Sequence, residues 1–356
     1  MKKFILMLCL LSLSSFATDT NEDEASGNSW NGYNNPYKID ANFEARFQNL
    51  PLKGDMSSIG LGWPGYYWAN QKAGISQRWQ SDMSKRKQFK YDALTVYQLK
   101  SMSAAQVNAL SPAEKYDIYM GNYTYPTVDK VRSQTSPGSQ IWAGICHGVS
   151  PAGLHHKEPQ VKTVTNADGV KITFYSSDIK ALAAYYYAKI SDTGITQVGK
   201  RCFMKGWFPI KGAGCSDVNP GSLHIIMANR LGITKNGFIA DIDRYKEVWN
   251  HVAVKFESKV LGYGSPSAGS AAGTYKTVSV KSTVHYTGGV DPSKSPILGT
   301  ENAKWDIKTY EYTLDLNAKG EIIGGDWESK ERPDFLWVKD KESFEHAYYG
   351  NIKSLL

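Results

Sequence analysis

Cys146 is the residue whose type and setting point most directly to covalent chemistry. It precedes a short run, residues 149–154, that can open a helix with Pro151 in its first turn. The unpaired N–H groups and the dipole at a helix N-terminus favour a thiolate over a thiol. We therefore expect a nucleophilic thiol, and a buried inert cysteine is the alternative interpretation.

The cysteine count supports a free thiol at this position. An N-terminal export signal would leave three cysteines in the mature chain, Cys146, Cys202 and Cys215. Disulfides form and persist in exported proteins. Cys202 and Cys215 enclose a short glycine-rich stretch that can loop back on itself, which predicts a disulfide between them. Cys146 is then the unpaired cysteine.

A thiol nucleophile also needs a base, and His224 is the candidate. It lies in an apolar run, residues 223–228, that we predict to be a strand. The next predicted strand carries Asp241 and Asp243, which alternation places on one face. We expect His224 to take the thiol proton and later to protonate a leaving amine. Asp241 would orient the imidazole, with Asp243 as the alternative.

Attack on a carbonyl creates an oxyanion, which requires N–H donors close to the sulfur. The backbone N–H of Cys146 is one candidate. The side chain of Gln140 or Trp142 is the other, and Gln140, six residues before the thiol, is preferred.

The segments before residue 133 are expected to lead into the region that carries this chemistry. Residues 1–17 have the charged start, apolar run and small residues of a signal peptide. Residues 18–35 read as a flexible acidic leader. Residues 36–132 have a helical pattern with capping boxes at Ser103 and Ser111. An inhibitory pro-region is one interpretation of this helical part.

Residues 133–356 are predicted to form an α+β region that holds the chemistry. A turn at 166–169 joins two short alternating runs into a hairpin, and a helix follows from about Ser177. Besides the two strands above, later alternating runs predict four more strands. They cover residues 252–256, 274–285, 307–316 and 321–323.

Composition excludes several classes of function. The signal peptide contains Lys2 and Lys3 and no acid, so the formal net charge of +7 falls to +5 after its removal. This charge is mild, and Lys85-Arg86-Lys87 alone does not make a nucleic-acid surface. No later stretch approaches the roughly 20 apolar residues of a membrane span. We expect a secreted protein, extracellular or periplasmic, that binds neither nucleic acid nor membrane.

Several separated motifs resemble those of the transglutaminase elicitor family, secreted enzymes of oomycetes that also occur in bacteria. They are SPAEKYDIYMG at 111–121, WAGICHG at 142–148, NPGSLH at 219–224, DIDRYKEVWN at 241–250, and GGDW at 324–327 with PDFLW at 333–337. Their common order along the chain makes the resemblance specific.

The resemblance implies a papain/transglutaminase-like cysteine enzyme core with an added helical N-terminal region. It implies γ-glutamyl transfer from a protein glutamine to a primary amine such as lysine. Cys146 and His224 match the family's functional residues, as do Asp241 or Asp243. Family members are described as calcium-dependent, although no segment here has EF-hand spacing. A papain-like protease, a glutamine deamidase and an inactive binding protein remain alternatives.

Overall fold

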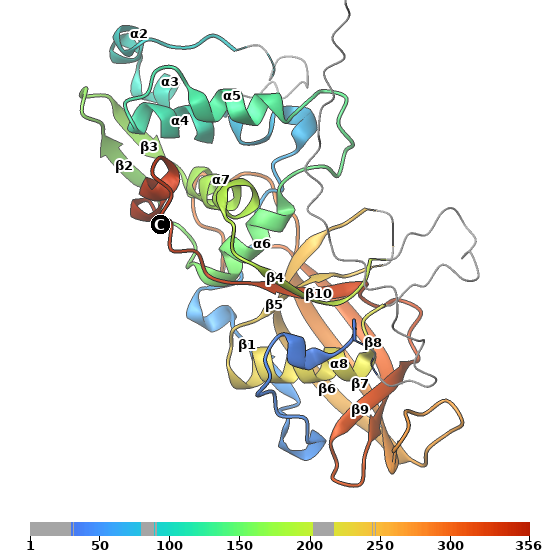
Figure 1. Ribbon diagram of the computed structural model, residues 1–356. Coiled ribbons are helices and arrows are strands. Elements are labelled where there is room, and N and C mark those ends of the chain that lie inside the picture. Colours follow the sequence, from blue (N-terminus) through green and yellow to red (C-terminus); the bar gives the residue numbers. More distant parts are fainter. Residues whose placement is uncertain are drawn as a thin grey trace, which may run out of the picture.

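An antiparallel sheet and a group of helices occupy opposite ends of the protein in a computed structural model (Figure 1). The structure describes residues 30, 32–79, 89, 91–201, 217–243, 245 and 247–356. The predicted signal peptide and most of the predicted leader lie outside these residues. Among the described residues, no helix has the length and apolar character to cross a bilayer. The molecule is α+β, as predicted.

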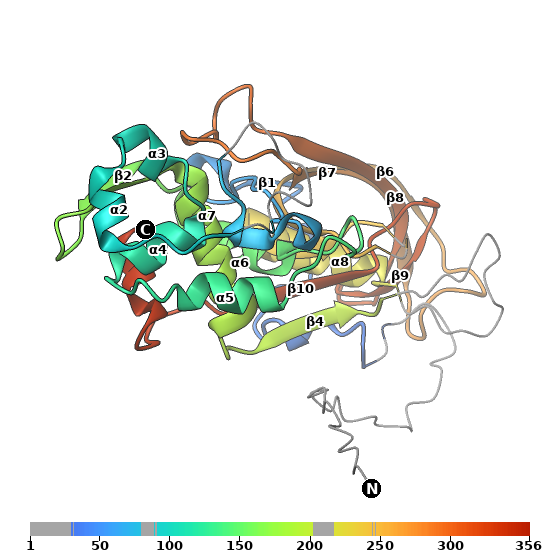
Figure 2. The ribbon, with the colours of Figure 1, turned by 90° about the horizontal axis from the view of Figure 1, so that it is seen from above.

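The main sheet has eight strands, all paired antiparallel, in the order β4-β10-β5-β6-β7-β8-β9 with β1 added to β6. Strands β6, β7 and β8 form a long meander that curves around α8 (Figure 2). The bounds are β1 Lys53–Asp55, β4 Ile195–Gly199, β5 Phe238–Asp241, β6 Asn250–Gly264, β7 Lys276–Thr287, β8 Trp305–Leu316, β9 Ile322–Trp327 and β10 Phe335–Lys339.

Most of the predicted strands are confirmed. The predicted hairpin is β2 (Lys162–Thr165) paired with β3 (Lys171–Phe174), and the four later runs correspond to β6, β7, β8 and β9. The short strands β4 and β10 were not predicted, although they continue the sheet beyond β5.

Short helices form the other end of the molecule, except for the helix at residues 220–227, which packs on the sheet (Figure 1). The capping boxes at Ser103 and Ser111 are present and start α3 and α4. Residues 36–79 are mainly irregular with short 3₁₀ turns and one short strand, so the helical prediction for that part was wrong. The bounds are α2 Val96–Ser101, α3 Ala104–Asn108, α4 Pro112–Tyr119, α5 Pro126–Ser133, α6 Cys146–His155, α7 Ser176–Tyr185 and α8 Pro220–Met227.

The run that contains His224 is helix α8, so the predicted strand at 223–228 was wrong. Asn219 caps this helix by accepting the Gly221 N–H at 2.8 Å, and Pro220 occupies its first position. Residues 220–227 are all buried, so the helix is apolar around most of its circumference. Such a run has no periodicity that separates a helix from a strand.

Strand β5 ends at Asp241, so the prediction that Asp241 and Asp243 share a strand was also wrong. Asp243 lies in a bend, where its Oδ1 accepts the backbone N–H of Tyr245 at 2.9 Å. The two carboxyl groups differ in burial, since Asp241 is fully buried and Asp243 is not.

The buried apolar residues form one cluster at the sheet and another among the helices. Helix α6 contributes to both, with Leu154 in the sheet cluster and Ala152 in the helical cluster. Each cluster contains residues from before and after position 133. The domain boundary placed there stays a prediction. The thiol thus begins a helix that is packed on both sides.

Candidate active site

Cys146 is the first residue of α6, as the sequence led us to expect of a thiol at a helix start. Two glycines let this helix start lie against neighbouring backbone. A Cβ on Gly144 would lie 2.3 Å from the carbonyl oxygen of Tyr67, and one on Gly148 would lie 2.0 Å from that of Ala184. The Ile145 N–H also donates to the Tyr67 carbonyl at 2.8 Å. These contacts fix the position of the thiol.

The half-buried Cys146 side chain borders a cavity of about 190 Å³. Its Sγ lies 3.3 Å from Nδ2 of Asn250 and 3.8 Å from the carbonyl oxygen of Val248. Aromatic side chains make up much of the wall. The lining residues are Trp63, Gly65, Tyr67, Cys146, Val149, Ser150, Trp249, Asn250, His251, Thr287, Gly288 and Gly289.

Asn250 is held so that its amide nitrogen faces the sulfur. Its Oδ1 accepts the indole N–H of Trp337 at 2.9 Å, which leaves Nδ2 as the donor toward Cys146. Its backbone carbonyl accepts the hydroxyl of Ser150, on α6, at 2.7 Å. The start of β6 is therefore joined to α6 beside the thiol. Sequence reasoning did not select Asn250, and its membership of a family motif was the available signal.

His251 is the histidine that lines the same cavity as Cys146. Its Nδ1 lies 2.5 Å from the carbonyl oxygen of Thr287 and 3.5 Å from Oδ2 of Asp306. Nδ1 must donate to the carbonyl, so Nε2 is the unprotonated nitrogen of the neutral ring. This is the arrangement of a general base whose second nitrogen is oriented by acceptors. Sequence reasoning found no partner for His251, because its partners lie on β7 and β8.

His224 has different surroundings. It is fully buried on α8, its Nδ1 lies 2.8 Å from the hydroxyl of Tyr312, and its ring packs against Phe47. Burial lowers its pKa to about 4. Helix α8 packs on β8 and β9, whereas α6 packs on α7, β5 and β6. The structure shows no contact between His224 and Cys146, and the role of His224 as base stays a prediction.

Asp241 is a neighbour of Asn250, the residue whose side chain contacts the thiol. It is the direct cross-strand partner of Asn250, and its Oδ1 accepts the backbone N–H of Trp249 at 3.3 Å. Its Oδ2 has no hydrogen-bond partner among the described residues. Burial, and then repulsion by Asp243, raise the pKa of Asp241 to about 8. Burial therefore favours the protonated carboxyl over the carboxylate.

The two predicted side-chain oxyanion donors are not part of the cavity wall. Gln140 is exposed and Trp142 is half-buried, and neither lines the cavity beside Cys146. Their role stays a prediction. Cys202 and Cys215 lie outside the described residues, so the predicted disulfide is a prediction as well.

The calcium dependence implied by the resemblance has no site in the part of the chain that the structure describes. No group of three His, Cys, Asp or Glu side chains there is arranged to hold a metal ion. Calcium prefers six to eight oxygen ligands, several of them carboxylates. The described residues do not fit such an ion, and we assign it no step.

The fold and the site together describe an α+β protein with a thiol at the start of a buried helix, packed against an antiparallel sheet and bordered by aromatic side chains. The family model for the transglutaminase elicitors matches residues 37–347, and the chain belongs to this family. This confirms the resemblance seen in the sequence motifs.

The crystal structure of the GP42 transglutaminase from Phytophthora sojae has a similar fold. It superposes with a TM-score of 0.67 at 22% sequence identity, and the match covers 91% of this chain and 97% of that one. No curated protein sequence matches the chain.

Proposed function

We propose that this protein is an exported protein-glutamine γ-glutamyltransferase with Cys146 as its nucleophile. The observation that carries the proposal is the position of the thiol, at the first residue of α6 and facing an aromatic cavity. Family membership supports acyl transfer over other thiol chemistry. The donor is a protein glutamine and the acceptor is a primary amine such as lysine.

In the first half-reaction the thiolate attacks the γ-carbonyl carbon of glutamine. We assign the role of taking the thiol proton, through Nε2, to His251, because it lines the same cavity as Cys146 and its Nδ1 is bound to a carbonyl. Asp306 stabilises the imidazolium that results. The C–N bond of the amide then breaks, the imidazolium gives its proton to the leaving nitrogen, and ammonia departs. A thioester on Cys146 remains.

The oxyanion of this step forms next to the sulfur. The backbone N–H of Cys146 is at the helix start, and Nδ2 of Asn250, 3.3 Å from Sγ, is the nearest side-chain donor. Asp241 acts as a positioning residue, because it holds the Trp249 backbone N–H and lies opposite Asn250. Its neutral form avoids a second negative charge beside the thiolate.

In the second half-reaction an amine attacks the thioester, the C–S bond breaks and the thiol regains a proton. Trp63, Tyr67 and Trp249 supply apolar walls that limit water and accept the alkyl stem of lysine. Desolvation there favours the neutral, nucleophilic amine. A protease or a deamidase would use the same thiol and imidazole, and would differ in the bond cleaved or in the use of water.

The reaction is tested with a glutamine-containing protein and a fluorescent alkylamine. Ammonia release and amine incorporation should be nearly equal, with the peptide bonds left intact. Backbone cleavage would identify a protease, and ammonia without incorporation would identify a deamidase. Absence of all three activities would favour an inactive binding protein.

The assignment of the two histidines is tested with single variants. Cys146→Ala should abolish transfer, and His251→Ala should lower kcat/KM by about 10²–10⁴-fold, the usual contribution of a general base. His285→Ala, on β7, is the matched control and should retain activity. If His224→Ala lost catalysis while folded and His251→Ala kept it, the predicted pair of Cys146 and His224 would be correct instead.

A further inference from the structure

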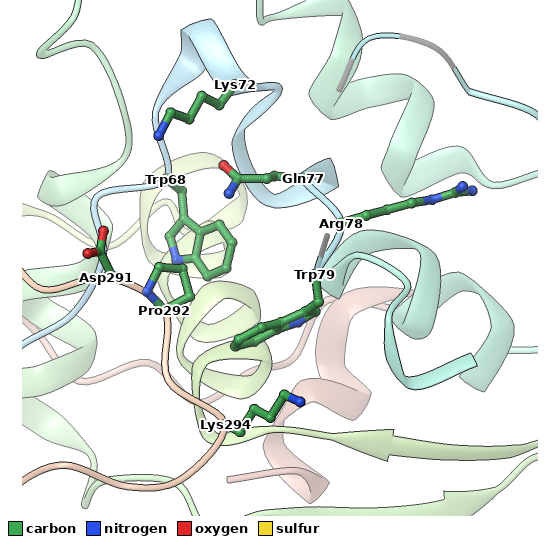
Figure 3. A pocket seen from close by; sticks show the side chains of 8 residues that line it. All are labelled: Trp68, Lys72, Gln77, Arg78, Trp79, Asp291, Pro292 and Lys294. Carbon is green, nitrogen blue, oxygen red and sulfur yellow. The ribbon is translucent and has the colours of Figure 1, made fainter. Parts of the chain in front are cut away.

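A second cavity, of about 490 Å³, is larger than the one beside Cys146 (Figure 3). Figure 3 shows the indoles of Trp68 and Trp79 along it, with Lys72 and Lys294 toward opposite ends. The lining residues are Trp68, Lys72, Gln77, Arg78, Trp79, Asp291, Pro292 and Lys294.

The same two chain segments line both cavities, so the two cavities are neighbours. Tyr67 borders the thiol cavity and Trp68, the next residue, borders the second one. On the other side Gly289 borders the first and Asp291 the second. Consecutive Cα atoms are about 3.8 Å apart, so the two cavities lie within the length of a few residues of each other.

The aromatic walls of the second cavity are fixed before any ligand arrives. Trp68 is buried and packs edge-on against Tyr66, with ring centroids 5.3 Å apart. The indole N–H of Trp79 donates to Asp178 at 2.7 Å, and its ring packs edge-on against Tyr175. A preformed aromatic site binds an apolar side chain with little loss of conformational entropy.

The charges around the cavity favour an acidic ligand. The guanidinium of Arg78 is neutralised by Glu114, with its Nε 2.9 Å from Oε2. Lys72 and Lys294 have no ion pair among the described residues, and Asp291 offsets one of these two charges. The remaining positive charge would repel an acceptor lysine and attract a carboxylate.

We propose that this cavity selects the donor protein by binding the residues that flank its reactive glutamine. An aromatic side chain lies between the indoles of Trp68 and Trp79, and an adjacent acidic side chain approaches Lys72 or Lys294. The inference rests on the proposed function, because that function places the reactive glutamine of the donor protein in the thiol cavity. It makes Lys72 and Lys294 specificity-determining residues.

The test uses donor peptides that share one glutamine and differ in two flanking residues, Phe-Glu, Phe-Lys, Ala-Glu or Ala-Lys. The ratio of kcat/KM values, measured by alkylamine incorporation, should favour Phe-Glu over Phe-Lys by roughly two- to fivefold, the effect expected of an exposed charge pair. In Lys72→Glu/Lys294→Glu the ratio should fall below one. The control Lys319→Glu, in an exposed turn, should keep the wild-type ratio.

A second measurement separates the two proposals. Fluorescence polarisation of the labelled peptides with Cys146→Ala reports binding without turnover, and Phe-Glu should bind more tightly than Ala-Glu. Equal kcat/KM and equal binding for all four peptides would overturn the inference while leaving transferase activity intact. Selective binding without any transfer by the wild-type protein would overturn the proposed function alone.

Discussion

At the scale of single residues, the chemistry depends on which ionisable groups are buried and what they face. Cys146 and His251 share a cavity, whereas His224 is enclosed by α8 and the meander. Burial lowers the pKa of His224 to about 4, which favours its neutral ring. The polar chain through Tyr312 and Ser282 engages Nδ1 of His224, whereas its buried Nε2 has no hydrogen-bond partner among the described residues.

The raised pKa of Asp241 makes stability depend on pH. Its pKa is about 8 in the folded protein and about 3.9 in an unfolded chain. Between these values the folded state keeps a proton that the unfolded state releases, so the free energy of unfolding falls as pH rises from about 4 to 8. Asp241→Asn has no carboxyl to titrate, so its free energy of unfolding should not fall in this way. The variant should therefore be more stable than wild type at pH 8, by up to a few kcal/mol.

Denaturant unfolding at pH 5 and pH 8 measures this effect. The difference between Asp241→Asn and wild type should grow with pH, whereas the exposed control Asp192→Asn should show no such trend. A difference that shrinks toward pH 8 would mean that the native carboxyl is ionised and stabilised by a partner.

At the scale of elements, a buried ion pair joins α4 to α7 behind the second cavity. Nζ of Lys115 lies 2.6 Å from Oδ2 of Asp178, and both side chains are fully buried. Asp178 also accepts the indole N–H of Trp79. Burial lowers the pKa of Lys115 and raises that of Asp178. The pair thus holds a cavity wall in place.

Lys115→Met should destabilise the protein by about 3–5 kcal/mol, because it leaves a carboxylate buried without its cation. Lys281→Met, which breaks the exposed pair with Glu311, is the matched control and should cost less than about 1 kcal/mol. Chemical denaturation measures both variants. Similar losses for the two would show that burial does not control the contribution of the α4–α7 pair.

At the scale of the whole molecule, the residues before position 133 belong to both cores and to both cavities. Trp63 and Tyr67 line the thiol cavity, and Trp68 and Trp79 line its neighbour. Phe47 lies in the sheet cluster and Tyr116 in the helical cluster. The geometry therefore favours a structural contribution over an inhibitory pro-region.

A chain that starts at residue 133 should consequently fail to form a cooperatively folded, active protein. It would expose the apolar faces of α6 and α7 and lack one wall of the thiol cavity. Circular dichroism, thermal unfolding and the amine-incorporation assay of this fragment test the expectation. A folded fragment with activity above that of the full chain would restore the pro-region interpretation.

Local patterns in the sequence determined much of this protein. The capping boxes at Ser103 and Ser111, the β2–β3 hairpin and the thiol at a helix start depend on residues that lie close together in the sequence. Separated family motifs determined its class. These features can be predicted because the interactions that produce them are short in sequence.

Tertiary structure alone decided which groups face the thiol. The apolar run at His224 is buried on nearly all sides, so its composition did not distinguish a helix from a strand. Asn250 and His251 acquire their roles from Trp337, Thr287 and Asp306, which lie on other strands. Pairing between distant strands sets these contacts, and no spacing within one segment encodes such pairing.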